Sequence, residues 1–138
     1  MLSKVNYLMH TDSIKKNIIP NLSNKQKNFV YAEEADVLNV ALFGMTAKEW
    51  RDKNLDLSKD GNIRDYTDLL HLIILSNLET KNADLIANGI SQKERLIILN
   101  QSAKDQVELL KNNKNIKELE KLQDDINRKV LKDGNKKE

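Results

Sequence analysis

The chain has 138 residues, with 39% hydrophobic residues to build a core, 32% charged residues to keep a surface hydrated, and a net charge of +2, which suits a single domain. It contains no cysteine, which excludes a disulfide scaffold, a thiol nucleophile and any metal site built on thiolates. No apolar run approaches the roughly 20 residues of a membrane span, and Lys15 and Lys16 interrupt the N-terminus before a secretory apolar segment develops. We therefore expect a cytoplasmic protein without a membrane partner.

Charge is segregated along the chain. Residues 1–28 hold five lysines against one aspartate, residues 29–90 hold eleven acids against six bases, and residues 91–138 are slightly basic. Basic ends can contact nucleic acid, although lysine-rich solubilising tails have the same composition. Residues 1–28 show no sustained apolar period, and Pro20 ends whatever helix precedes it. We expect a basic, loosely attached N-terminal arm over residues 1–28.

The first clear helix is predicted over residues 33–43. Glu33 and Glu34 lie in its first turn, where acids complement the helix dipole, and Gly44 supplies a left-handed stop. Thr46 and Glu49 then fit a capping box, in which each side chain satisfies a backbone N–H near the other. A second short helix is therefore expected over about 47–54, which makes residues 33–54 resemble a helix–turn–helix.

Residues 55–65 are predicted to form the main loop, and the next helix is expected to begin at Asp65 or Thr67. The run 69–75 is apolar almost all round, so periodicity alone also allows a buried strand. The apolar pattern continues to Gly89 without a turn signal, which favours a buried central helix over the strand.

The C-terminal part is predicted to contain two helices. Ser91 and Glu94 form a second capping box, and apolar residues then recur at spacings of three and four up to Leu110. After a weak region near residue 112, an amphipathic helix is expected over 113–132, with residues 133–138 as a disordered tail. Its narrow apolar stripe resembles a coiled-coil seam, although a helix that docks on its own domain has the same pattern. The stripe consists of Ile116, Leu119, Leu122, Ile126 and Val130.

These patterns predict an all-α fold: a single small domain of about five helices, with a core over residues 29–112 and the C-terminal amphipathic helix. Two groups within the core are candidates for an interaction site or a structural clamp. Trp50 with Arg51 lies on the short second helix, where we interpret the Trp as a core anchor, with a partner hot spot as the alternative. The second group precedes the central helix, and in it we expect Arg64 and Asp65 to form a charge pair that locks the loop to the helix. It comprises Asn62, Arg64, Asp65 and Tyr66.

The residues give little support for catalysis. His71 lies in an apolar run and is interpreted as a core histidine, and the histidine spacings of common metal sites are absent. A calcium loop that starts at Asp56 has glycine at its sixth position but Thr67, not glutamate, at its twelfth. Asp56, Asp60 and Asp65 are the one trio that we nominate for a metal-dependent nuclease. We expect no enzyme, no cofactor and no metal.

Residues 29–110 resemble a region of phage-type KilA-N proteins that lies C-terminal to their DNA-binding KilA-N module. The chain has only about 28 residues before this region, too few for the KilA-N module itself. The resemblance implies a role in phage regulation, and we expect the region to mediate assembly or protein recognition. The matching stretches, in order, are FVYAEEADVLN (29–39), ALFGMTAKEWR (41–51), GNIRDY (61–66), LSNLE (75–79), NADLI (82–86) and SQKERL (91–96).

We therefore expect a non-enzymatic interaction or oligomerisation domain of a phage or mobile-element protein, acting in regulation or phage–host conflict in a bacterial cytoplasm. Its expected partner is another protein or a second copy of itself. The alternative is a DNA-binding module that uses residues 33–54 and the basic ends. In that alternative Lys48, Arg51 and Lys53 would face the phosphates, because a recognition helix needs positive charge there.

Overall fold

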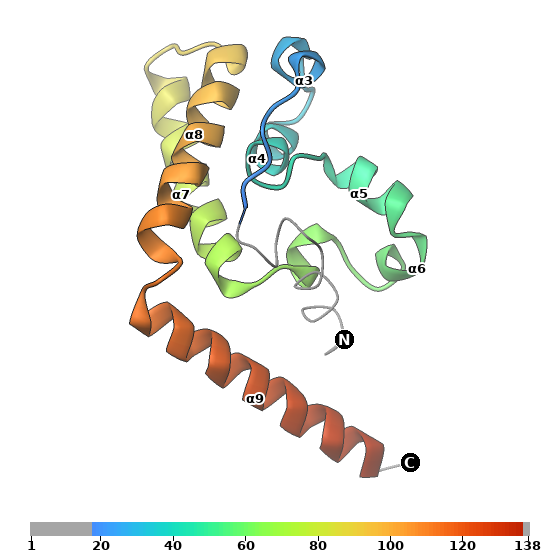
Figure 1. Ribbon diagram of the computed structural model, residues 1–138. Helices are drawn as coiled ribbons and strands as arrows, with labels where there is room; N and C mark the ends of the chain where they lie inside the picture. The colour runs from blue at the N-terminus through green and yellow to red at the C-terminus, as the bar shows by residue number, and fades with distance from the viewer. Residues whose placement is uncertain (1–17, 137–138) are drawn as a thin grey trace.

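The computed structural model describes residues 18–136, with side chains up to residue 129, and this part of the chain contains only helices and their connections (Figure 1). The all-α prediction is confirmed. The helices are α3 (Asn24–Asn28), α4 (Glu34–Phe43), α5 (Ala47–Lys53), α6 (Leu55–Ser58), the 3-10 helix η1 (Ile63–Tyr66), α7 (Leu69–Ala87), α8 (Gln92–Leu110) and α9 (Lys114–Lys136).

The core is built around α4, which packs against α7 and α8. Every residue of α4 from Val37 to Phe43 is buried, so this part of the helix is covered on all sides. Such a helix shows little amphipathic periodicity, because it has no solvent face. The predicted central helix 69–89 is also present as α7, and the strand alternative for residues 69–75 is wrong.

Helix ends follow the predicted signals in most places. Gly44 has φ 73° and ends α4, and the reciprocal capping box of Thr46 and Glu49 opens α5. Ser91 caps α8 by accepting a hydrogen bond from the backbone N–H of Glu94. Gly44 also lies against Pro20, and a Cβ atom built on this glycine would come within 2.9 Å of the Pro20 Cβ. A side chain is therefore disfavoured here both by the backbone angle and by the contact.

Two predictions in the middle of the chain need correction. Residues 55–65 are not a plain loop, because they contain α6 and most of η1. Helix α7 begins at Leu69 rather than near Asp65 or Thr67, since the Asp68 carboxylate accepts the His71 backbone N–H and caps the helix there. Asp65 instead belongs to the preceding helix, η1, where its side chain accepts the N-cap backbone N–H and completes a capping box.

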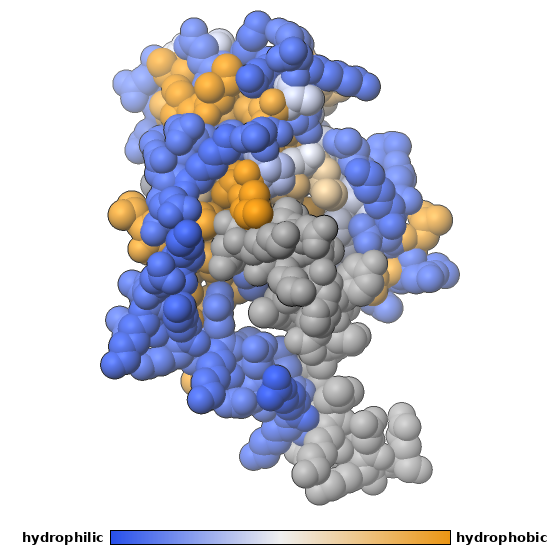
Figure 2. All heavy atoms as spheres, viewed as in Figure 1, coloured by the Kyte–Doolittle hydropathy of each residue, from blue (hydrophilic) through white to orange (hydrophobic). Residues whose placement is uncertain are grey.

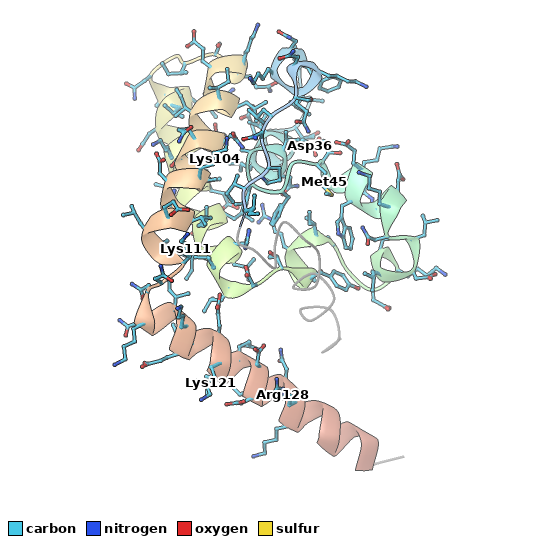
Figure 3. All side chains as sticks on the ribbon, viewed as in Figure 1. Asp36, Met45, Lys104, Lys111, Lys121 and Arg128 are labelled. Carbon is cyan, nitrogen blue, oxygen red and sulfur yellow. The ribbon has the colours of Figure 1, made fainter. Side chains whose placement is uncertain are left out.

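The described part of the predicted N-terminal arm is attached to the core. Ile19 is buried, and the Asn100 side chain of α8 donates to the carbonyl oxygens of Pro20 and Ala41 at 3.0 Å each. Lys104 of α8, labelled in Figure 3, donates to the Asn21 side chain at 2.6 Å. Residues 18–28 therefore form a strap across α4 and α8 rather than a loose arm, and residues 1–17 lie outside the described residues.

A polar network joins α4, α7 and α8 at the N-terminal end of α4. The buried Arg95 guanidinium pairs with both oxygens of Glu34 and donates to the Asn82 side-chain oxygen at 3.0 Å. Gln92 accepts from the Tyr31 N–H and donates to the Tyr31 carbonyl, at 2.8 Å each. These hydrogen bonds from Arg95 hold the pKa of Glu34 below its usual value.

Helix α9 leaves the core at an angle and extends beyond it (Figure 1). It continues to Lys136, so the prediction of a disordered tail from residue 133 is wrong for residues 133–136. None of the helices in residues 18–136 is both long enough and apolar enough to span a lipid bilayer.

Candidate protein-interaction surface

The N-terminal end of α9 is fixed on the core by one apolar and one polar contact, and a local hydrogen bond to Asn113 caps its start. Ile116 is buried, with 9% of its surface exposed, and belongs to the main core. The Asn113 side chain accepts the Ile116 N–H at 3.0 Å, and the Glu120 carboxylate accepts the Leu70 N–H at 3.2 Å. Helix α9 therefore packs on the first turn of α7 and is free of the core further along.

The carboxylate of Glu120 lies in an unfavourable place for a charge. It is half-buried, and Asp68, which already caps α7, is a second acid at the same helix end. Burial is the main reason that the pKa of Glu120 is raised above its usual value; Asp68 and Asp124 add to the rise, whereas the Leu70 N–H and His71 oppose it. The contact of α9 with α7 is therefore more favourable when Glu120 is protonated.

Beyond this contact the apolar stripe is open to solvent. Leu119, Leu122 and Ile126 are 51%, 54% and 48% exposed, although each is a large hydrophobic residue on one side of the same helix. In the view of Figure 2 the described part of α9 presents mainly hydrophilic side chains, as expected for the polar side of an amphipathic helix. The Val130 side chain, the last member of the predicted stripe, lies outside those described.

The exposed leucines and isoleucine of α9 form one wall of a groove of about 410 Å³. The other wall comes from η1 and the start of α7, including Leu72, which is 37% exposed. Large hydrophobic side chains that gather along a groove are more informative than single exposed ones such as Leu55 and Leu109. The full lining is Arg64, Asp65, Thr67, Leu69, Leu72, Leu119, Leu122, Gln123 and Ile126.

The predicted clamp around residue 64 is present with a different partner. Arg64 forms its ion pair with Glu79 of α7 at 3.0 Å rather than with Asp65. Asp65 instead accepts the Asn62 N–H, while the Asn62 side chain accepts the Arg64 N–H. The segment is thus joined to α7 by charge, and Arg64 and Asp65 also border the groove.

Trp50 and Tyr66 are core residues. Trp50 is 2% and Tyr66 0% exposed, and their ring centroids are 5.2 Å apart. The Tyr66 hydroxyl donates to the Leu57 carbonyl at 2.6 Å, which joins η1 to α6. The interpretation of Trp50 as a core anchor is therefore correct, and the partner hot spot is excluded because so little of its surface can be reached.

The proposed DNA-contacting residues lie on α5. Arg51 and Lys53 are exposed, but the Lys48 ammonium is paired with Asp52 at 3.1 Å. The helix holds three cations against two acids in seven residues, so its surface is close to neutral. Nothing in this geometry concentrates the positive charge that phosphate contacts require.

The structure brings together no metal site in the residues that it describes. Asp56, Asp60 and Asp65 do not form one, and no other group of three or more His, Asp or Glu side chains in residues 18–129 can hold a metal ion. Asp56 lies in α6 beside Lys59 instead of opening a calcium loop. His71 is 1% exposed, contacts Asp68 through Nδ1 and stacks with Phe43, as expected for a core histidine.

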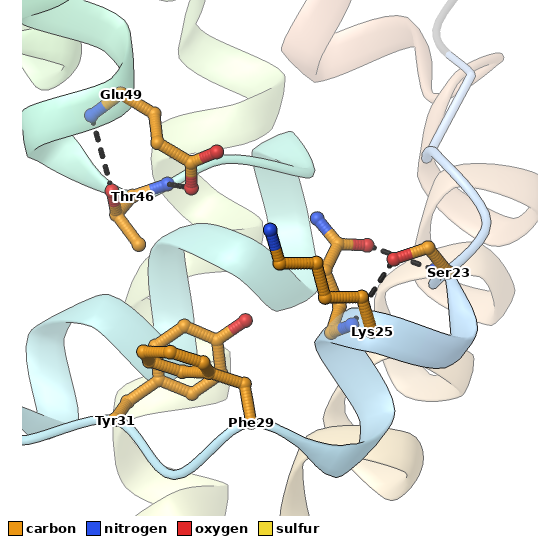
Figure 4. Close-up of a pocket in the computed structure, with 7 residues that line it drawn as sticks. Ser23, Lys25, Phe29, Tyr31, Thr46 and Glu49 are labelled. Carbon is orange, nitrogen blue, oxygen red and sulfur yellow. Dashed lines mark hydrogen bonds between the residues drawn. The ribbon is translucent and has the colours of Figure 1, made fainter.

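A second hollow of about 360 Å³ lies between α3 and α5 (Figure 4). Its rim carries two capping boxes, Ser23 with Gln26 and Thr46 with Glu49. Within each box, the side chain of one residue accepts the backbone N–H of the other. The Phe29 ring packs on Tyr31 with centroids 4.7 Å apart. Because the helix-end N–H groups that these boxes cap are already used, the α9 groove is the better candidate site.

Three residues of this surface cannot be assigned to it from apolar spacing alone: Leu69, Leu72 and Glu120. The run 69–75 is apolar almost all round, so nothing in its spacing separates the buried side from the side that faces α9. In the sequence, Glu120 is one of many charges that flank the apolar stripe. Its one distinguishing signal is its place four residues after Ile116, on the helix side that continues the buried contact.

Comparison with known proteins gave no match to any protein-family model, to any curated protein or to any solved structure. The resemblance of residues 29–110 to the KilA-N-associated region therefore stays a prediction.

Proposed function

We propose that this protein is a non-enzymatic interaction and self-association domain that acts through the apolar stripe of α9. The observation that supports this most directly is the row of half-exposed Leu119, Leu122 and Ile126 along a groove. Burial of apolar surface is favourable by about 25 cal/mol per Å², so a helix that leaves three such residues in water gains by covering them.

The shape of the domain supports the same proposal. Helix α4 is enclosed by its own chain from Val37 to Phe43, whereas α9 has its first turns on α7 and its remaining length beyond the core. The core therefore does not need the exposed part of the stripe for its own packing. The resemblance of residues 29–110 supports a place in phage or mobile-element regulation or phage–host conflict, in the cytoplasm of a bacterial host.

The test is the molar mass by light scattering after size exclusion, over loading concentrations from micromolar to near millimolar. We expect the mass of the unaltered protein to rise with concentration, and the L119K/L122K double variant to stay monomeric. The matched control is L55K/L109K, which places the same two substitutions at exposed leucines outside the groove and should associate like the unaltered protein.

A monomeric mass at every concentration would overturn self-association. A binding measurement with duplex DNA tests the alternative function. If the protein bound random duplex at low salt and released it between roughly 50 and 200 mM, and if K48E/R51E/K53E abolished that binding, the DNA-binding function would replace the one proposed here.

A further inference from the structure

We infer that the partner of the α9 stripe is a second copy of this chain, paired antiparallel and centred between Leu122 and Gln123. This inference rests on the proposed function and adds its partner, orientation and register. It depends on two features of the exposed side of α9: the spacing of its apolar residues about one centre, and the alternating signs of the charged residues beside them.

The apolar residues are symmetric about that centre. Leu119 lies before it by the same number of residues as Ile126 lies after it, and Leu122 is next to it. In an antiparallel pair, Leu119 of one helix therefore faces Ile126 of the other, and the two Leu122 side chains meet near the twofold axis. All three are half-exposed in the single chain, so each is available to a partner.

The charged residues beside the stripe have the sign pattern that this pairing needs. At about 100° per residue, Glu118, Lys121, Asp125 and Lys129 fall on one flank of α9, and all four are exposed. Their signs in chain order are negative, positive, negative, positive. About this centre the positions directly opposite Glu118 and Lys121 are residues 127 and 124 of the second copy. Lys129 and Asp125 of the second copy therefore lie two residues and one residue from exact register, about 3 and 1.5 Å along the axis. Long charged side chains span these offsets, and both pairs are of opposite charge.

A parallel pair in register does not use this pattern. It would bring each stripe residue to its own equivalent, and Glu118 would have no contact with Lys129 of the other copy, which lies more than two helical turns further along. The opposite flank of α9 is unable to supply the missing partners, because Ile116 and Glu120 on that side pack against the core. The antiparallel arrangement is thus the one that matches apolar and charged residues together.

The absence of cysteine makes the orientation directly testable by single cysteine variants under mild oxidation. We expect L122C to form a disulfide-linked dimer, because its two Cα atoms lie close to the axis. L119C alone should not form one, since its two copies are about 10 Å apart along the helix axis, beyond the reach of a disulfide. An equimolar mixture of L119C and I126C should give the mixed dimer.

The matched control is L109C, an exposed leucine of α8 outside the groove, which should remain monomeric under the same oxidation. Efficient self-linking of L119C together with failure of the mixed L119C–I126C link would establish a parallel pair and overturn the inference, while self-association itself would stand. A dimeric mass with no α9 disulfide at any position would place the interface elsewhere and overturn the inference as well. A monomeric mass would overturn both.

Charge reversal gives a second readout that does not depend on disulfides. We expect E118K to raise the dimer dissociation constant about threefold to tenfold, since it places two lysines together at both ends of the pair, each exposed ion pair being weak. K129E should have a similar effect, and the double variant E118K/K129E should restore most of the loss, because the facing charges are again opposite. If the double variant were as weak as the product of the two single effects, Glu118 and Lys129 would not face each other.

Discussion

Arg95 shows how one buried cation organises three helices. It has 8% of its side chain exposed, whereas its partner Glu34 is 43% exposed, so the pair lies where one charge is desolvated and the other still touches water. Removal of the guanidinium leaves the Asn82 and Ile90 acceptors inside the protein without that donor. Arg95 therefore stabilises the fold through its buried hydrogen bonds, although in the sequence it is only one charged residue near the start of α8.

We predict that R95A lowers the free energy of unfolding by about 2–4 kcal/mol, because it breaks a buried network and leaves polar atoms unsatisfied. The exposed Arg51 supplies the control, since R51A should change stability by less than about 0.5 kcal/mol. Urea denaturation followed by circular dichroism measures both. Equal effects of the two variants would show that the network adds nothing.

Glu120 leads to a prediction about pH. Its pKa is raised in the folded protein from the usual 4.5, so the folded state binds more protons than the unfolded state between the two values, and this residue's contribution to stability decreases as pH rises through that window. The variant E120Q keeps an oxygen for the Leu70 N–H but cannot ionise. We expect its stability relative to the unaltered protein to rise through the same window and then stay constant.

The measurement is urea denaturation of both proteins from pH 4 to pH 8. Glu34 acts in the opposite direction: its lowered pKa means that its contribution is lost as pH falls below 4.5. The comparison with E120Q cancels that background because Glu34 is present in both proteins. A stability difference that did not change with pH would contradict the effect assigned to Glu120.

At the scale of the elements, the turn between α4 and α5 offers a matched pair of glycines. Gly44 and Gly89 have φ 73° and 75°, but a Cβ at Gly44 would meet Pro20, whereas a Cβ at Gly89 would meet nothing within 4 Å. The difference between the two alanine variants therefore isolates the contact of the strap from the strain of the backbone.

We expect G89A to cost about 1 kcal/mol of unfolding free energy, from the left-handed backbone alone. G44A should cost a further 1–3 kcal/mol, roughly the penalty of overpacking a closed site, because the Pro20 ring cannot rotate away. Thermal and urea denaturation of both variants provide the test. Equal costs would mean that the strap moves freely from the α4–α5 turn.

Most helices were predictable because their signals are local. Capping residues, glycine stops and acids in first turns mark where α4, α5 and α8 begin or end, and these elements lie where the sequence indicates. The start of α7 cannot be fixed from the sequence, because Asp65 and Asp68 can both cap a helix, and only the fold assigns the first to η1 and the second to α7.

The candidate site was predictable only in part. The stripe of α9 is visible as spacing, but which of its residues are buried depends on where the helix meets α7. Contacts between distant segments, such as Arg64 with Glu79 or Asn100 with Pro20, have no local signal in a single sequence. The attachment of residues 18–28 to the core is unpredictable for the same reason.

For the whole molecule, the fold predicts a gradient of local stability. Helix α4 is covered by α7 and α8, so its amide protons exchange only when the domain unfolds, whereas the part of α9 beyond its contact with α7 has few tertiary contacts and opens locally. Hydrogen exchange followed by mass spectrometry should show slow exchange over residues 37–43 and fast exchange beyond residue 126 in dilute solution.

The same experiment at high protein concentration links the gradient to self-association. Pairing of α9 with a second copy should slow exchange in its exposed part and leave α4 unchanged. Exchange in α9 that did not depend on concentration would count against pairing of the helix.

The burial of α4 from Val37 to Phe43 also has a consequence for synthesis on the ribosome. Helix α4 is finished at Phe43, but α8 comes much later in the chain, and Asn100 of α8 is the residue whose side chain donates to the Ala41 carbonyl. At about 5–20 residues per second, an apolar segment without a solvent face waits on the order of several seconds for its cover. We expect the nascent chain to depend on holding chaperones during this interval, and to aggregate as a truncated product if translation stops before α8 has emerged.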